Sequence, residues 1–168
     1  MKSEIPFELQ KIAQIIDALG LRLFLIGARA LIVHGVDIGR ETSDWDLTIN
    51  SSVKELRETL THALRNAGFN VQWRSWGLAV DDGIHVDINY APLTLDEEFE
   101  RRAKKVWKNV FLPSLEDLVI LKLMGRKKDI ADAKRIASTK KLDYDYLKRR
   151  AEQAGLSSEL KKLSGLSV

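Results

Sequence analysis

One short segment constrains the fold of this chain more than any other, an apolar run that ends at a glycine and continues as a helix. The run LRLFLI (21–26) is almost continuously apolar, which is typical of a buried strand. Gly27 follows it, and ARALIVHGV (28–36) has the character of a short helix. A strand that passes through one glycine directly into a helix predicts an α/β unit.

The segments around this unit extend it into a mixed sheet with flanking helices. Phe7 to Leu19 has apolar residues at helical spacing, and Gly20 is expected to end that helix. Further strands are expected at WDLTI (45–49), FNVQWRSW (69–76), GLAV (77–80), IHVDINY (84–90) and once more within 104–112. A two-residue turn at Asp82-Gly83 should join two of these strands as a hairpin.

Serine residues mark the starts of two more expected helices. Ser51 or Ser52 can cap a helix over 53–67. Ser114 can cap another that begins in PSLED, with Asp117 at the spacing of a capping box.

The C-terminal part of the chain is amphipathic and helical, from 130 to about 138 and from 144 to about 163. The expected fold is therefore α/β, with a mixed β-sheet core and flanking helices over 1–112. A C-terminal helical segment over 113–168 should pack with this core as one compact unit.

Composition excludes several classes of protein. With 168 residues the chain is about one domain, and without cysteine it can form neither a disulfide framework nor a thiolate metal site. With only three histidines, the composition also argues against a His-rich zinc site. The N-terminus MKSEIPFELQ lacks the apolar core of a signal peptide, and no apolar run reaches the roughly 20 residues of a membrane span. A cytoplasmic protein without a membrane partner is the expectation.

The positive charge is unevenly distributed although the net charge is only +3. Three basic clusters lie in the second half of the chain: Arg101, Arg102, Lys104 and Lys105; Arg126, Lys127 and Lys128; Lys148, Arg149 and Arg150. These clusters are either solvated helix faces or an electrostatic footprint for polyphosphate or nucleic acid. Charge alone does not decide between the two.

Carboxylates on two expected strands indicate a metal site. Asp44 and Asp46 lie on one face of the strand around 45–49, and Asp87 lies on the polar face of IHVDINY. If the apolar faces of both strands enter one core, the three carboxylates can stand side by side. Oxygen ligands of this kind suit Mg²⁺ or Mn²⁺ better than zinc. The alternative is that these aspartates are solvent-facing positions of an amphipathic sheet.

Gly27 favours the metal site over that alternative. A glycine at the junction of strand and helix lets a ligand approach the backbone closely. The N-terminus of the following helix offers free N–H groups to phosphate. A phosphate cradle upstream of a carboxylate cluster predicts a nucleotide-plus-metal site.

The segment IGARALIVHGVDIGRETSDWDL (26–47) resembles the signature of the DNA polymerase β-like nucleotidyltransferase superfamily. That signature is an apolar strand, a Gly-Gly or Gly-Ser pair, a helix, and an Asp-x-Asp pair on the next strand. Small members often carry Arg-x-[Ser/Thr]-x-Asp-x-Asp, which Arg40, Thr42, Asp44 and Asp46 match. PSLEDLVILKLMGRKKDIADAKRI is similar to the end of small antitoxin-like and abortive-infection-type members, with Lys122, Arg126 and Asp129 in it.

The resemblance implies a minimal nucleotidyltransferase that moves an NMP group from an NTP, with ATP preferred, to an acceptor hydroxyl. It implies Mg²⁺ or Mn²⁺ at Asp44, Asp46 and Asp87, and Asp87 would also help to deprotonate the acceptor. The implied triphosphate ligands are Gly27, Ala28, Arg29, Arg40, Thr42, Lys122 and Arg126. The acceptor would be RNA or a partner protein, and a small helical toxin-like protein is a further expected partner.

For several residues the sequence allows both a functional and a structural role. Ala28 stands where the superfamily has glycine or serine and offers no hydroxyl, so Arg29 either compensates as a phosphate ligand or lies on the helix surface. Trp73 and Trp76 either stack a nucleobase or pack against the sheet, with packing favoured. Structural roles are also favoured for Asp129 and His34, and His85 lies beside the predicted site without a clear role.

Three competing functions follow from the same residues. An antitoxin-like protein would keep the fold and act through a partner. A drug-modifying nucleotidyltransferase has a similar Gly…Asp-x-Asp layout, but its acceptor domain is expected to be too large for the roughly 55 residues beyond the core. A nucleic-acid-binding module without catalysis ranks last, because it has no need of three clustered aspartates.

Overall fold

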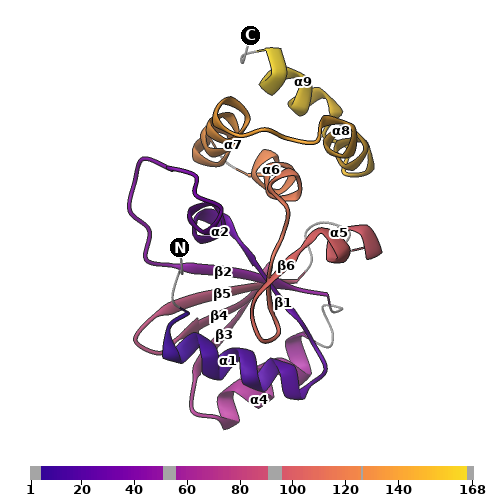
Figure 1. Cartoon of the computed structure of the whole chain (residues 1–168). Helices are drawn as coiled ribbons and strands as arrows, with labels where there is room; N and C mark the ends of the chain where they lie inside the picture. The colour runs from indigo at the N-terminus through magenta and orange to yellow at the C-terminus, as the bar shows by residue number, and fades with distance from the viewer. Residues whose placement is uncertain (1–4, 51–55, 91–95, 126, 166–168) are drawn as a thin grey trace.

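The computed structural model describes residues 5–50, 56–90, 96–125 and 127–165, and within them the chain forms a mixed sheet between two helical layers (Figure 1). The strands are β1 (Leu23–Ile26), β2 (Trp45–Ile49), β3 (Asn70–Arg74), β4 (Gly77–Asp81), β5 (His85–Tyr90), β6 (Lys104–Trp107) and β7 (Val110–Leu112). They form one seven-stranded sheet in the order β3-β4-β5-β2-β1-β7-β6. The predicted α/β class with a mixed sheet is therefore confirmed.

The sheet contains two parallel and four antiparallel strand pairs. β2 pairs antiparallel with β1 and parallel with β5, and β1 pairs parallel with β7. The antiparallel hairpins β3-β4 and β6-β7 close the two edges. β1 and β2 lie at the centre, which explains why β1 is buried along its whole length.

Helices cover both faces of the sheet. Figure 1 shows α1 and α4 on one face, and α2 and α6 on the other, with α7 to α9 stacked beyond α6. The helices are α1 (Phe7–Ala18), α2 (Gly27–Val33), α4 (Thr61–Asn66), α5 (Glu97–Arg102), α6 (Leu115–Leu123), α7 (Lys127–Thr139), α8 (Tyr144–Gln153) and α9 (Ser157–Gly165), with a π-helical turn η1 (Leu56–Leu60) before α4. In the part of the chain that the structure describes, no helix is both long and apolar enough to cross a membrane.

Because side chains alternate along a strand, one face of the sheet is apolar and the other is polar. Leu47, Ile49, Val86 and Ile88 are fully buried, and they lie on one face by the register of β2 and β5. The opposite face carries Asp46 and its neighbours and lies under α6. The predicted separation into an apolar and a polar face is confirmed, although this polar face is partly covered and Thr48 on it is fully buried.

Three local predictions differ from the structure. The link between β4 and β5 has three residues, 82–84, with Gly83 at φ +76°, because Asp81 pairs with His85. The segment 104–112 forms a hairpin and not one strand, since the chain turns at Lys108, whose φ is +43°.

The predicted helix over 144–163 is two helices, α8 and α9, because Gly155 adopts φ +71° after α8. The predicted cap at Ser51 or Ser52 lies outside the described residues. Ser114 caps α6 as predicted, with its Oγ accepting a hydrogen bond from the N–H of Asp117 at 3.2 Å. The division of the chain at residue 113 stays a prediction.

Candidate active site

Two of the predicted carboxylates are direct neighbours in the sheet. β2 and β5 run parallel, and Asp46 is the register partner of Asp87. Side chains at paired positions lie on the same face, so both carboxylates belong to the face under α6. Asp44 lies one residue before β2 and is exposed. The pair at the centre of the site is therefore Asp46 and Asp87, with Asp44 at its edge.

Gly27 lies against the carboxylate of Asp46. Ile26 is the register partner of Asp46, and the chain then turns at Gly27 with φ +70°. A Cβ placed on Gly27 would lie 2.5 Å from Oδ2 of Asp46 and 3.0 Å from its Cβ. The position therefore requires glycine for two reasons: the backbone is left-handed, and there is no space for a side chain.

The carboxylates of the site repel one another. Burial raises the pKa of Asp46 to about 6, and the negative charges of Asp87 and Asp44 contribute, while Lys122 opposes the shift. Burial also raises the pKa of Asp87, and the charges of Asp44 and Asp81 act in the same direction. Such a cluster favours a proton or a cation between its members.

His85 lies between two of these carboxylates. Its Nε2 is 2.8 Å from Oδ1 of Asp87, and its Nδ1 is 2.7 Å from Oδ1 of Asp81. The hydrogen bond with Asp81 is the largest cause that raises the pKa of His85. The imidazolium form thus partly neutralises Asp87 in this arrangement.

The predicted centre with three carboxylates on one ion stays a prediction. Among the described residues, no group of three or more His, Cys, Asp or Glu side chains is placed to hold a metal ion. The physical reasons are the contact of Asp87 with His85 and the position of Asp44 in an exposed loop. A carboxylate pair nevertheless fits Mg²⁺, which proteins often hold through one or two carboxylates together with substrate phosphates. The mutual repulsion of Asp46 and Asp87 points to the same use.

Two adjoining cavities open at this carboxylate pair. The first, about 340 Å³, is lined by Ile26, Gly27, Asp46, Asn89, Leu118, Leu121, Lys122, Met124, Gly125 and Asp129. The second, about 420 Å³, is lined by Asp46, Trp76, Asp87, Asn89, Lys128 and Asp129. Gly27 and apolar residues of α6 belong to the first cavity, whereas Asp87 and Trp76 belong to the second. Asp46 belongs to both.

The other predicted phosphate ligands are less closely associated with the cavities. Ala28 is buried in the core. The guanidinium of Arg29 lies 4.6 Å from the ring centre of Trp45, and its Nε has no hydrogen-bond partner in the described structure. Thr42 is half-buried in the loop before β2, and Arg126 lies outside the described residues. Their phosphate-binding role stays a prediction.

Arg40 and Lys122 share a buried carboxylate that sequence reasoning missed. Arg40 forms a bidentate ion pair with Asp132 at 2.7 and 2.9 Å. Nζ of Lys122 lies 2.9 Å from Oδ2 of Asp132 and 3.1 Å from Oδ1 of Asp129. Burial alone would raise the pKa of Asp132, but hydrogen bonds from Arg40 and Lys122 lower it below its ordinary value. Both cations thus have a structural role, and their contact with phosphate stays a prediction.

Trp73 and Trp76, which were expected either to stack a nucleobase or to pack against the sheet, have different surroundings in the structure. Trp73 stacks on Tyr90, with ring centres 6.4 Å apart, and Arg57 covers its ring. Trp76 is 36% exposed and lines the second cavity. His34 has a structural contact, since its Nε2 is 2.8 Å from the carbonyl oxygen of Pro113.

Sequence reasoning assigned no role to several residues that line the cavities. Asn89 lies two positions after Asp87 on the same strand face, and that spacing was the available signal. Lys128 was predicted only as part of a basic cluster, and Met124 gave no signal, because their positions depend on how α6 and α7 pack over the sheet.

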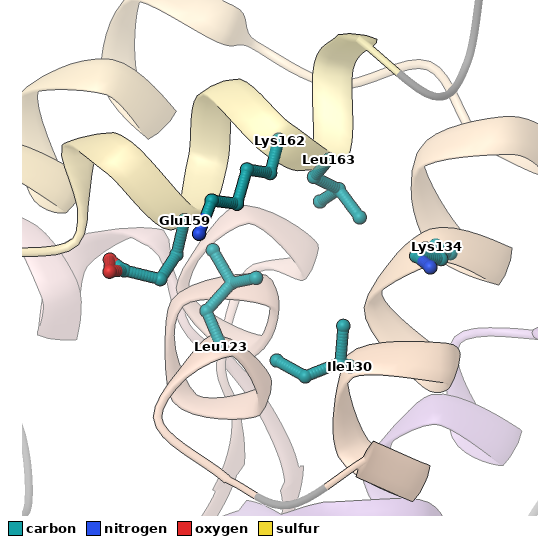
Figure 2. Close-up of a pocket in the computed structure, with 6 residues that line it drawn as sticks. All are labelled: Leu123, Ile130, Lys134, Glu159, Lys162 and Leu163. Atoms are coloured by element: carbon teal, nitrogen blue, oxygen red, sulfur yellow. The ribbon is translucent and has the colours of Figure 1, made fainter.

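A further cavity of about 310 Å³ lies between α6, α7 and α9, as Figure 2 shows. Its lining residues are Leu123, Ile130, Lys134, Glu159, Lys162 and Leu163. Leu123, Ile130 and Leu163 converge on its centre, whereas the carboxylate of Glu159 is directed away (Figure 2). It contains no carboxylate pair and is not the candidate active site.

Comparisons with known proteins identify the family and the fold of this chain. The chain belongs to the family of nucleotidyltransferases of unknown function (DUF6036), whose model matches residues 5–163. No curated protein matches the chain in sequence. The predicted membership of the DNA polymerase β-like nucleotidyltransferase superfamily is thereby confirmed, and solved structures with a similar fold are consistent with it.

Two solved structures of the antibiotic-resistance factor ANT(2'')-Ia share this fold. The solution structure has a TM-score of 0.55 and 17% identity over 94% of this chain and 93% of the other. The crystal structure with adenylyl-2''-tobramycin has a TM-score of 0.57 and 16% identity over 91% and 97%. An antigenic nucleotidyltransferase-like protein from Paracoccidioides brasiliensis matches with a TM-score of 0.50 and 19% identity over 77% and 72%.

The match to ANT(2'')-Ia corrects one expectation. The acceptor domain of a drug-modifying nucleotidyltransferase is expected to be too large for this chain, yet ANT(2'')-Ia is matched over 93% to 97% of its length. The size of the chain therefore does not exclude that class of acceptor.

Proposed function

We propose that the protein is a Mg²⁺- or Mn²⁺-dependent enzyme that transfers an NMP group from an NTP to an acceptor hydroxyl and releases pyrophosphate. The observation that carries the proposal is the register pairing of Asp46 with Asp87. Gly27, which tolerates no side chain against Asp46, adds an accessible stretch of backbone beside that pair. A carboxylate pair next to accessible backbone suits a nucleotide with its metal ion.

The division of the site into two cavities supports separate places for the two substrates. The first cavity combines Gly27 with the apolar side chains of Leu118, Leu121 and Met124. These side chains suit the ribose and base of a nucleotide whose phosphates lie near Gly27. ATP is the proposed donor, in keeping with the adenylylated product bound to ANT(2'')-Ia.

The reaction assigns different tasks to the carboxylates. Asp46 and Asp87, with Asp44 at the edge, would hold the divalent ion, which neutralises the charge of the phosphates when it is bound. The acceptor oxygen attacks the α-phosphorus, the bond from the α-phosphorus to the bridging oxygen breaks, and pyrophosphate leaves. Asp87 accepts the proton of the acceptor hydroxyl, because it lines the second cavity, where the acceptor would enter.

Gly27 is the residue that we place at the triphosphate. Lys122 lines the same cavity, but two carboxylates, those of Asp129 and Asp132, already occupy two of its three N–H donors. Arg40 is not among the residues that line either cavity, and it binds Asp132. We therefore assign to these two cations the support of α6 and α7, with phosphate binding as a secondary role.

The acceptor remains RNA or a protein in this proposal, and an aminoglycoside is compatible with the size of the chain. An antitoxin-like protein that acts through a helical toxin-like partner is not favoured by the family or by the structural neighbours.

Calorimetric titration with Mg²⁺-ATP tests the site. Wild-type protein should bind Mg²⁺-ATP and lose most of that binding when EDTA replaces the metal. Asp46→Asn should reduce the affinity at least tenfold, because it removes a ligand of the ion. Asp82→Asn is the matched control, since Asp82 is an exposed carboxylate in the nearby β4-β5 link. Equal affinity in Asp46→Asn and Asp82→Asn would refute the assignment.

A further inference from the structure

The second cavity contains groups that the transfer reaction does not use. Asp46 and Asp87 are assigned to the metal ion, and Asp129 pairs with Lys122 at 3.1 Å. The amide of Asn89 donates to the carbonyl oxygen of Leu47 at 3.3 Å. The side chains left to recognise an acceptor are the indole of Trp76 and the ammonium of Lys128.

Trp76 is held in place and still accessible. Its carbonyl oxygen accepts a hydrogen bond from the N–H of Tyr90 at 3.3 Å, which ties the β3-β4 turn to the end of β5. Trp76 is 36% exposed and lines the cavity. An exposed indole on a fixed turn beside two carboxylates is suited to stack on a planar ring.

Lys128 supplies positive charge to the same cavity from another element. It lies in the first turn of α7 and is exposed, as is its neighbour Lys127. An ammonium at the rim of an otherwise acidic cavity attracts an anionic group of a ligand, such as a phosphate. The cavity therefore offers a stacking surface and a phosphate contact together with the proposed base Asp87.

We propose that Trp76 and Lys128 form the acceptor subsite and that the acceptor is the end of a single-stranded polynucleotide. A terminal nucleobase stacks on Trp76, a backbone phosphate lies at Lys128, and a sugar hydroxyl lies at Asp87. The assignment rests on the proposed function for the reaction, but the binding of a polynucleotide can be measured without it. The groups described here do not distinguish RNA from DNA, so both are tested.

The test is fluorescence anisotropy with two fluorescein-labelled single-stranded tetranucleotides of the same sequence, one RNA and one DNA. Trp76→Ala should weaken binding of the preferred probe about tenfold, the size expected for the loss of one stacked base. Trp76→Phe should retain most of the affinity, because a phenyl ring still stacks. Lys128→Ala should weaken binding and lower the salt dependence by about one phosphate contact. Lys161→Ala, an exposed cation in α9 away from the cavity, should change nothing.

Affinity for Mg²⁺-ATP, measured on the same variants, separates the acceptor subsite from the nucleotide subsite. Trp76→Ala and Lys128→Ala should leave it unchanged. The proposal is overturned if Trp76→Ala binds the probe as tightly as wild type, or if its loss appears in Mg²⁺-ATP binding instead. It is also overturned if the wild type binds neither probe, including the case in which it adenylylates tobramycin.

Failure of the proposed function would look different. If the wild-type protein binds the tetranucleotide through Trp76 but never transfers label from ATP, the acceptor subsite is supported and the proposed enzymatic activity is refuted. If label is transferred to an acceptor and Trp76→Ala does not affect that transfer, the enzymatic activity is supported and the acceptor subsite is refuted.

Discussion

At the scale of single residues, the contact of Gly27 with Asp46 determines whether the site can form. The turn at Gly27 has φ +70°, and Oδ2 of Asp46 occupies the space that a Cβ would need. This contact brings the accessible backbone and the first carboxylate together without any intervening side chain. The same contact makes the position intolerant of substitution.

Gly27→Ala should therefore destabilise the fold and abolish Mg²⁺-ATP binding. Gly20→Ala is a matched control, because Gly20 has φ +77° but nothing within 4 Å of the added Cβ. Strain at a left-handed position costs on the order of 1 kcal/mol in both variants. The additional loss in Gly27→Ala, measured by urea unfolding, reports the clash with Asp46. Equal losses and intact nucleotide binding in the two variants would contradict the close contact.

The raised pKa of Asp46 predicts a pH dependence of stability. Its pKa in the folded protein is about 6, above the ordinary value of 3.8, so folding favours the protonated form. Without metal, the contribution of Asp46 is fully present below pH 4 and is lost as the pH rises through 6. Asp46→Asn should thus be more stable than wild type at pH 7.5, by about 1–3 kcal/mol, and nearly equal to it at pH 4.

Thermal melts at the two pH values measure this difference. Mg²⁺ at pH 7.5 should stabilise the wild type and leave Asp46→Asn unaffected. A wild-type protein that is the more stable of the two at pH 7.5 without metal would show that Asp46 is not strained.

These residues could be predicted from the sequence because a strand has a period of two. That period placed Asp46 on the face opposite Leu47, and Asp87 on the matching face of its own strand. The partner of Arg40 could not be predicted in the same way. Asp132 lies 92 residues further along the chain, and no local pattern selects it among the acidic residues of the C-terminal helices.

At the scale of elements, Asp132 connects the loop before β2 to α6. It is 1% exposed and pairs with Arg40 from the loop and with Lys122 from α6. This ion pair network holds α6 and α7 over the polar face of the sheet, where they complete the cavities. The loop that carries Asp44 is thereby fixed to the helices.

Asp132→Asn should destabilise the protein by about 2–3 kcal/mol, because Arg40 and Lys122 lose their shared carboxylate and Lys122 keeps only Asp129. Since the pKa of Asp132 is lowered, its stabilising contribution should also disappear in wild type as the pH falls below the ordinary value for aspartate. Chemical unfolding at pH 7 and pH 3 measures both effects. Exposed Asp145 provides the control substitution to asparagine. The same loss in both variants, or none in Asp132→Asn, would remove the structural role of the network.

The differences between predicted and observed elements have local physical causes. The sequence predicts one strand within 104–112, where the structure has the hairpin β6-β7. The turn at Lys108, with φ +43°, contains no glycine or proline that would have indicated it. The break between α8 and α9 did have a signal, since a glycine commonly follows the last residue of a helix, and Gly155 does so here. The apolar residues keep a helical spacing on both sides of Gly155, so the sequence predicts one continuous helix.

At the scale of the whole molecule, a buried polar cluster joins the C-terminal helices to α5. Asp117 accepts hydrogen bonds from Ser114 at 2.8 Å, Tyr146 at 2.7 Å and Arg150 at 3.0 Å. Arg150 also donates to Asp96 at 2.9 Å. Asp117 had been predicted only as a helix-capping residue, because its partners are contributed by α8.

Removing the charge of Asp117 should therefore affect the fold and not the site. Asp117→Asn should lose about 2–3 kcal/mol of stability, because buried Arg150 loses the carboxylate of Asp117 and keeps that of Asp96. Tyr146→Phe, which keeps the ion pair, should lose only about 1–2 kcal/mol. Both variants should bind Mg²⁺-ATP like wild type at temperatures where they are folded. Loss of nucleotide binding by folded Asp117→Asn would show that this cluster belongs to the active site.

The most direct test of the central claim is to follow the α-phosphate of ATP. Wild-type protein, Asp46→Asn, Asp87→Asn and the control Asp82→Asn are incubated with Mg²⁺, a cell extract as the source of acceptors, and ATP labelled at either the α- or the γ-phosphate. The account predicts that α-label, and not γ-label, becomes attached to an acceptor with wild type and Asp82→Asn. Both other variants should lose at least a hundredfold in rate, since Asp46 and Asp87 hold the ion and Asp87 takes the proton. Transfer of γ-label, or full α-label transfer by Asp46→Asn and Asp87→Asn, would contradict nucleotidyl transfer at this carboxylate pair.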